Sequence, residues 1–380
     1  MFRKMGNNCT IICMVVLVVF LSFVYGCGNQ IEGDSEKITA EVLGDSMIVG
    51  LRNITGELSL KSLVTVTAHG KGLKFSEIDR AYVFETSPDM RSIAYAADDG
   101  IYVIGTDGSD KRKITDMNPK LDLNSDQKRI IGKVMAWSPD GKRIAFVSGG
   151  NLYSKNVYDK SEPAKLVAKR TQDRITISES SPALAPRIDG IICPGWIDNS
   201  TLVYQDFFME FDGQADYHFN IIKIKEDGSE KQVIIQQGRE PLLSPDRTKI
   251  LYHIANDRGG EVRIADTDGA NSVMASDLLG TEREPMIYSW SRDGSHIIFD
   301  GFAIDAASGQ RTIFSGQPYS NDISATGAAL PAYSPDGRWV LFPGDGAPGL
   351  VKAENGNFVY DLSGAFSSLR GITAISWIKG

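Results

Sequence analysis

Two charged triplets contain side chains that could perform acid–base chemistry. Arg239-Glu240-Pro241 and Arg283-Glu284-Pro285 each stand shortly before an apolar run that ends in a Ser-x-Asp tripeptide. A carboxyl group beside a guanidinium could act as a general acid or base, or could bind a small ligand or a cation. The two triplets differ by three residues in their distance from that tripeptide. Because the two triplets are not at equivalent positions, the alternative is that they are solvent-exposed charges in the connections between strands.

A second segment mixes aromatic side chains with carboxylates. Its candidate binding residues, together with an arginine from the preceding connection, are Arg187, Asp206, Phe207, Phe208, Glu210, Phe211, Tyr217 and His218. Large aromatic residues and arginine are enriched at the energetic centres of binding surfaces. We expect a contact patch for a protein or a glycan. The alternative is that Phe207, Phe208 and Phe211 extend strands and pack back onto the fold.

Motifs of the common enzyme classes are missing from the sequence. It contains no Gly-x-Ser-x-Gly, no His-Glu-x-x-His and no Gly-x-x-x-x-Gly-Lys. The four histidines, His69, His218, His253 and His296, are spread along the chain. Residues 266–269 resemble the start of a calcium loop but lack its terminal glutamate, so a hairpin turn is expected there. We expect no cofactor, no metal and no assigned catalytic residue.

A recurring corner predicts how these residues are positioned. Each copy has Ser and Asp two residues apart and precedes an apolar, β-rich run: Ser87-Pro88-Asp89, Ser138-Pro139-Asp140-Gly141, Ser244-Pro245-Asp246, Ser291-Arg292-Asp293-Gly294 and Ser334-Pro335-Asp336-Gly337. Proline and Asp suit a type I turn between two strands. A corner repeated roughly every 50 residues is typical of a β-propeller with four-stranded blades. A degenerate copy, Gly195 to Asn199, fits the same series.

The two ends of the chain supply one further blade. Ile375 to Ile378 is predicted to form its first strand, and Asp45–Leu51, Glu57–Leu60 and Leu63–Ala68 its second, third and fourth strands. Pairing the two ends removes the exposed edges of an open array. The sequence therefore predicts an all-β propeller over residues 38–380. Seven blades are favoured, and six with irregular ends are the alternative.

The repeats resemble the WD-like propeller repeats of the TolB family, which also occur in propeller domains of prolyl-oligopeptidase-type enzymes. The resemblance covers about residues 40–380 and rests on Trp137 to Phe146 (WSPDGKRIAF) and on the similar segments around the other corners. It implies the fold and indicates no particular function. TolB proteins carry an additional N-terminal α/β domain, which we do not expect here, so a Tol-system role is not implied.

The N-terminal residues indicate export. Arg3 and Lys4 precede an apolar stretch, Ile11–Val24, which is short for a membrane span and suits a secretory signal. The segment ending in Gly26-Cys27 resembles a bacterial lipobox, although Tyr25 stands where a small residue is usual. We expect residues 1–26 to be a signal peptide, Cys27 to be lipidated and residues 27–37 to form a tether. An ordinary signal peptide or an uncleaved anchor is the alternative.

These features predict the cellular location of the protein and its general role. Loss of Arg3 and Lys4 with the signal takes the formal net charge from −8 to −10, which argues against nucleic acid as a partner. The long insertions, such as residues 116–133 and 169–190, are expected on one face of the ring, where loops can carry function. We expect a non-catalytic binding scaffold, lipid-anchored in the bacterial cell envelope, for an envelope protein or a cell-surface polymer. The alternative is a hydrolase or lyase at the channel mouth, with Glu240 or Glu284 as the acid–base group and a divalent metal as a possible aid.

Overall fold

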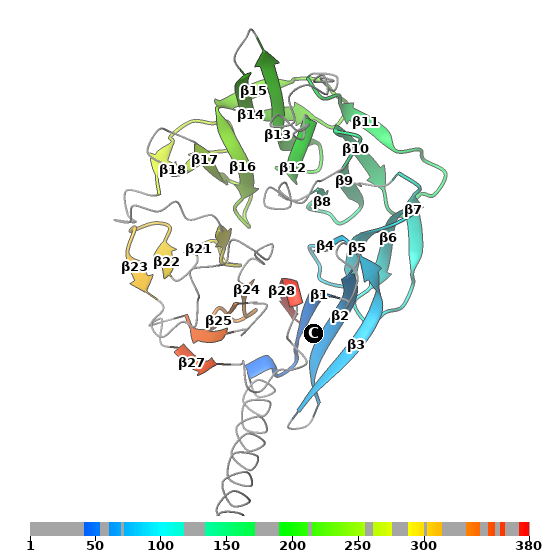
Figure 1. The fold of residues 1–380 in the computed structure, drawn as a ribbon, viewed down its shortest axis with the longest axis vertical. Helices are drawn as coiled ribbons and strands as arrows, with labels where there is room; N and C mark the ends of the chain where they lie inside the picture. The colour runs from blue at the N-terminus through cyan, green and yellow to red at the C-terminus, as the bar shows by residue number, and fades with distance from the viewer. Residues whose placement is uncertain are drawn as a thin grey trace, which may run out of the picture.

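The chain folds into a ring of four-stranded antiparallel sheets around a central axis (Figure 1). The computed structural model describes residues 42–53, 61–69, 72–117, 134–171, 190–211, 215–254, 261–275, 288–299, 302–313, 332–342, 349–353, 358–361 and 372–379. The prediction of an all-β propeller is confirmed. No helix in these ranges is both long and apolar enough to cross a bilayer.

Six of the sheets each consist of four consecutive strands. In chain order they are β4 (Val83–Thr86), β5 (Ser92–Ala97), β6 (Gly100–Gly105) and β7 (Arg112–Thr115); β8 (Met135–Trp137), β9 (Arg143–Ser148), β10 (Asn151–Asn156) and β11 (Lys165–Ala168); β12 (Gly190–Trp196), β13 (Thr201–Phe211), β14 (Ala215–Lys225) and β15 (Gln232–Gln236); β16 (Gly238–Leu243), β17 (Lys249–Ile254), β18 (Glu261–Asp266) and β19 (Val273–Met274); β20 (Tyr288–Trp290), β21 (His296–Phe299), β22 (Phe302–Asp305) and β23 (Arg311–Ile313); β24 (Ala332–Tyr333), β25 (Trp339–Phe342), β26 (Gly349–Lys352) and β27 (Phe358–Asp361). We number these sheets as blades one to six.

The remaining sheet joins both ends of the chain. Its order is β28 (Ile372–Lys379), β1 (Ser46–Asn53), β2 (Lys61–His69) and β3 (Gly72–Ala81), and Ser46 pairs with Lys379. The predicted pairing of the two ends is confirmed, but the strand assignment was wrong by one. Leu63–Ala68 lies in the third strand, and Gly72–Ala81 is the fourth, because β2 and β3 form a long hairpin. Glu57–Leu60 lies outside the described residues.

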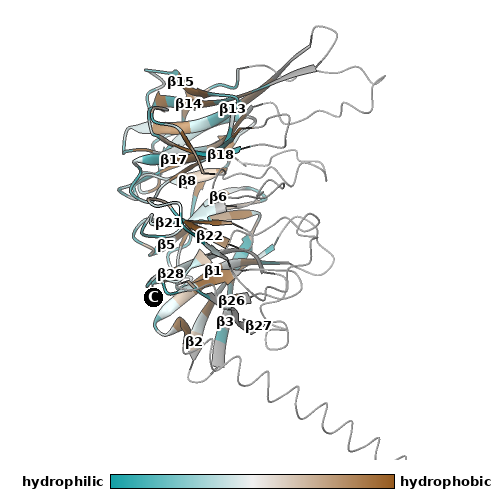
Figure 2. Cartoon of the chain, turned by 90° about the vertical axis from the view of Figure 1, so that its left-hand side faces the viewer, coloured by the Kyte–Doolittle hydropathy of each residue, from teal (hydrophilic) through white to brown (hydrophobic). Residues whose placement is uncertain are grey.

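The hydrophobic core lies between neighbouring sheets. Side chains alternate along each strand, so adjacent residues face opposite neighbours. In β5, for example, Ala94 packs against blade two, while Tyr95 packs against the sheet of β1–β3. Figure 2 shows the apolar segments of this packing along the strands from the side. Each blade is therefore held by both of its neighbours.

The Ser-x-Asp corners share one hydrogen-bond pattern. In all five, the Ser Oγ donates to the Asp Oδ1 at 2.6–2.7 Å and accepts the backbone N–H five residues after the serine at 2.8–3.0 Å. The five serines are all buried. The corner at Ser291 has Arg292 in place of proline and keeps the pattern. Serine and aspartate, rather than proline, thus define the turn.

A tryptophan just before the corner links some blades through the innermost strands. Trp137 Nε1 donates to the carbonyl of Glu85 at 3.1 Å, and Trp196 Nε1 donates to that of Ala136 at 3.1 Å. Trp290 Nε1 does the same to the Leu242 carbonyl at 3.3 Å. Each acceptor lies in the first strand of the preceding blade, so these bonds fix the inclination of one blade against the next.

Candidate functional site

The third blade differs from its neighbours by its long central hairpin. β13 and β14 pair at eleven positions, whereas β9 and β10, the equivalent strands of blade two, pair at six. Residues 205–211 and 215–219 therefore belong to strands rather than to a loop. Among the described residues, β12 pairs with β13 no further than Gly190–Phe207, and the pairs from Phe208–His218 to Phe211–Ala215 join β13 and β14 alone. We call these four pairs the two-stranded projection.

One face of this hairpin packs against the fourth blade. The rings of Phe207 and Phe219 stack with centroids 4.8 Å apart, and the Arg239 guanidinium lies 3.7 Å above the Phe219 ring. Phe207 is only 8% exposed. The alternative interpretation, in which it packs back onto the fold, is thus correct for Phe207. A cation held over an aromatic face at this distance is attracted to the ring quadrupole, so Arg239 joins the two blades.

The other face of the hairpin looks toward the second blade. Here the rings of Phe208 and His218 stack at 4.7 Å and are half-buried. Two residues before Phe208 along β13, Asp206 is completely buried and accepts a hydrogen bond from the Thr171 hydroxyl through Oδ2. The stacked rings on this face are thus partly accessible to solvent, whereas the Asp206 carboxylate is not.

Glu240 lies on the innermost strand of blade four in a strained conformation. Its φ is +52°, in the left-handed region, and a register shift interrupts β16 between Arg239 and Leu242. Its backbone N–H donates to Gln205 Oε1 at 2.6 Å. Burial raises the pKa of the Glu240 carboxyl, and the adjacent Arg239 opposes that rise. A carboxyl group in this state can hold a proton at a higher pH than an exposed one, which suits a general acid.

Blade three repeats this distortion at the equivalent place. Cys193 precedes Pro194 as Glu240 precedes Pro241, has a φ of +53° and interrupts the pairing of β12 with β13. A left-handed residue directly before proline costs free energy, since both features restrict the backbone. Two adjacent innermost strands therefore carry a bulge at the same level of the ring.

The structure brings together some of the predicted site residues. Asp206, Phe207, Phe208, His218, Arg239 and Glu240 lie where the third blade meets its two neighbours. Glu210, Phe211 and Tyr217 belong to the projecting strands β13 and β14. Cys27, Arg187, Arg283 and Glu284 lie outside the described residues. The two predicted sites, the aromatic segment and the first charged triplet, thus form one region.

Three residues of this region were missed by the sequence analysis as site residues: Thr171, Tyr204 and Gln205. No sequence signal marks Thr171, because its partner is 35 residues away. A signal did exist for the hairpin. Asp212-Gly213 is a strong hairpin dipeptide and follows a run rich in β-forming residues from Leu202. Because successive side chains of a strand point to opposite faces, that run also predicts Gln205 on one face and Tyr204 and Asp206 on the other.

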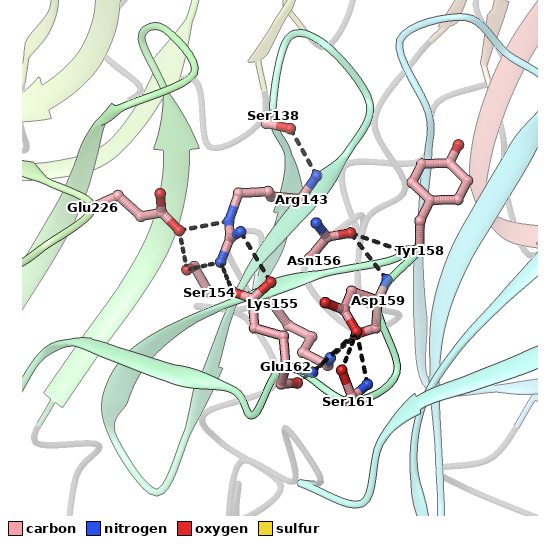
Figure 3. Close-up of polar contacts among 10 residues, drawn as sticks. All are labelled: Ser138, Arg143, Ser154, Lys155, Asn156, Tyr158, Asp159, Ser161, Glu162 and Glu226. Carbon is pink, nitrogen blue, oxygen red and sulfur yellow. Dashed lines mark hydrogen bonds and ion pairs between the residues drawn. The ribbon is translucent and has the colours of Figure 1, made fainter.

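A network of charged side chains joins blades two and three at their tight-turn end, opposite the projecting part of the β13–β14 hairpin (Figure 3). Arg143 Nε is 2.5 Å from Glu226 Oε1, and its Nη2 is 2.7 Å from Glu162 Oε1. Ser154 Oγ donates to the same Glu226 oxygen at 2.5 Å, and the buried Lys155 ammonium donates to the carbonyls of Asp159 and Glu162. Because these charges neutralise one another, we interpret this network as a junction between blades rather than a binding site.

Comparisons with known proteins support the fold. No protein-family model matches the chain, and no curated protein sequence does. Oligogalacturonate lyase from Vibrio parahaemolyticus is similar in structure with a TM-score of 0.53 at 11% identity, over 80% of this chain and 90% of that one. The β-propeller domain of the trilobed protease from Pyrococcus furiosus reaches 0.51 at 13% identity, over 82% and 92%.

TolB from Acinetobacter baumannii is also among the similar structures, as the repeats imply. It has a TM-score of 0.44 at 14% identity, over 91% of this chain and 71% of that one, which is too distant to carry an argument. At such identities the likenesses to solved structures show a shared propeller architecture and leave activity open. The chain is a β-propeller, and the solved structures that are similar to it include both a lyase and a protease domain.

Proposed function

We propose that this protein is an exported propeller, anchored by lipid at Cys27, which binds an envelope protein or a cell-surface polymer without catalysis. Its contact element is the projecting part of the β13–β14 hairpin. The observation that supports this role is the run of four residue pairs, from Phe208–His218 to Phe211–Ala215, beyond the last β12 pair that the structure describes.

The base of the hairpin favours rigid presentation. Phe207, Phe219 and Arg239 pack below the projection and attach it to blade four. The stacked Phe208 and His218 rings stand at the start of the projection and remain partly exposed. A partner that binds a preformed surface orders few additional side chains, so more of the contact free energy contributes to affinity.

The test is a crosslinking pull-down from intact cells with a shortened hairpin. Replacing residues 209–217 by Asn-Gly joins Phe208 to His218 through a two-residue turn and keeps the blade below it. We expect the partner recovered with the full-length protein to be lost at least tenfold. Tyr158→Ser, which alters an exposed aromatic residue of blade two, is the matched control and should retain it. Equal recovery with the shortened hairpin would reject the contact element.

Cys27→Ala tests the anchor separately. This variant should leave the membrane fraction while its purified propeller still binds the identified partner. If Cys27→Ala fractionates with membranes as the parent does, lipidation at that residue is wrong, whatever the outcome for the hairpin.

The second candidate is a hydrolase or lyase, and the observation that favours it is Glu240. Its half-buried carboxyl lies on an innermost strand, with a raised pKa and a strained backbone, and such features cluster at active sites. Screening polysaccharides and lactones, with and without divalent metal ions, would test this. Turnover that falls at least a hundredfold in Glu240→Gln, with unchanged thermal stability, would favour the enzyme over the scaffold.

A further inference from the structure

Asp206 is a buried carboxylate with only half of its hydrogen-bonding capacity used. Its side chain is 0% exposed, Oδ2 accepts the Thr171 hydroxyl, and Oδ1 has no hydrogen-bond partner. None of the ion pairs among the described residues involves Asp206. An ionised carboxylate enclosed without a compensating positive charge is costly by several kcal/mol. The position therefore calls for a partner.

The Tyr204 hydroxyl has the same deficit on the same side of the strand. Tyr204 is 0% exposed, and its Oη has no hydrogen-bond partner. Residues two apart in a strand point to the same face, and Tyr204 packs in the core between blades two and three. Tyr204 and Asp206 therefore face the second blade from neighbouring positions of β13, each with an unpartnered oxygen.

The arginine of the neighbouring blade is on the wrong side to neutralise Asp206. Arg239 stacks on Phe219, which pairs with Phe207, and these side chains face blade four. Gln205, on that same face, accepts its bond from Glu240. Asp206 and Tyr204 face blade two instead, where Thr171 follows β11. The backbone of β13 thus separates the positive group from the buried carboxylate.

We propose that Asp206, Thr171 and Tyr204 bind one hard cation between the second and third blades. All three supply oxygen, which suits Ca²⁺, Na⁺ or K⁺ rather than zinc or copper. The Thr171 hydroxyl gives its proton to Asp206 and keeps lone pairs for the cation. Among the described residues no group of three or more His, Cys, Asp or Glu side chains could hold a metal, so this site has a single carboxylate and neutral oxygens. It departs from the expectation of no metal.

The bound cation compensates a buried charge between the second and third blades. Its charge offsets the one negative charge of Asp206, and its coordination uses the Oδ1 and Oη atoms that have no other partner. It would therefore bind the folded ring far better than the unfolded chain and raise the unfolding temperature. This inference is independent of whether the hairpin binds a partner.

The experiment measures thermal unfolding of the full chain, solubilised in detergent and freed of metal by EDTA, in choline chloride at constant ionic strength. CaCl₂, NaCl and KCl are added separately. At a hundredfold excess over Kd, one of them should raise the Tm by about 4 °C for a propeller of this size. The salt that does so identifies the cation. If none of the three raises the Tm, the proposal is wrong.

Variants connect that shift to the site. Asp206→Asn, which keeps the shape of the side chain, should abolish the shift, and Tyr204→Phe should move its midpoint to at least threefold higher cation concentration. Asp227→Asn, at an exposed turn of the same blade, should retain it in full. An unchanged shift in Asp206→Asn overturns the proposal. If that variant does not fold, an unchanged midpoint in Tyr204→Phe does the same.

Discussion

Replacing Ser138 by alanine removes two hydrogen bonds from one corner and adds none. Its hydroxyl is 0% exposed, donates to Asp140 Oδ1 at 2.6 Å and accepts the Arg143 N–H at 2.9 Å. A hydrogen bond to a charged group contributes about 1.5–3 kcal/mol and a neutral one about 0.5–1.5 kcal/mol, and the exposure of Asp140 places the first at its lower end. We expect Ser138→Ala to lower the free energy of unfolding by about 2–3 kcal/mol.

Urea unfolding followed by tryptophan fluorescence measures this difference. The matched control is Ser229→Ala, because the Ser229 hydroxyl also donates to an aspartate, Asp227, at 2.5 Å, but both residues are exposed. The control should cost less than about 1 kcal/mol, since water replaces the lost bond. If Ser138→Ala destabilises the protein no more than Ser229→Ala, the corner bonds do not hold the blade and the reasoning is refuted.

Three further outcomes follow from the same structure. Glu226→Gln should cost about 1–2 kcal/mol in urea, because Arg143 loses one of its two carboxylate partners across the blade junction; wild-type stability would mean that the pair is not formed. Gly337→Ala should cost about 1 kcal/mol, since its φ is +73° and no atom lies within 4 Å of the added Cβ; a cost near zero would show a relaxed turn. The pKa values of Asp89 and Asp246 lie below the unfolded value of 3.8, chiefly because each carboxylate accepts a hydrogen bond from the corner serine. Their contribution to stability is therefore present above pH 3.8 and is lost as pH falls through the folded pKa values. The Asp89→Asn, Asp246→Asn double variant should lose stability less steeply with falling pH, as measured by circular dichroism, and an unchanged slope would contradict this.

The blade strands are predictable because a local device marks them. Each Ser-x-Asp corner makes its hydrogen bonds within six consecutive residues, so the sequence contains the whole interaction. The apolar, β-rich run that follows the corner at Ser138 is the strand β9 (Arg143–Ser148), as expected. Local chemistry and pattern agree there, which is the condition under which such predictions succeed.

The candidate site was harder to predict because its contacts join distant residues. Thr171 meets Asp206, and Gln205 meets Glu240, across 35 residues in each case. The aromatic residues in 207–219 suggested a contact patch, but aromatic residues also have a high β propensity, and the observed pairing places them in two strands. Similarly, the N-terminal strands were misassigned because β2 and β3 contain several apolar positions that fit more than one register.

The pairing of β1 with β28 has a consequence for how the molecule is made. Ser46 leaves the ribosome roughly 330 residues before its partner Lys379. Closing a loop of roughly 330 residues costs about 5 kcal/mol of chain entropy before the last sheet forms. Until then β1 has an unpaired edge, which other chains can join. Ring closure should thus be the slow, concentration-sensitive step of folding, and early termination of translation would leave a permanently open edge.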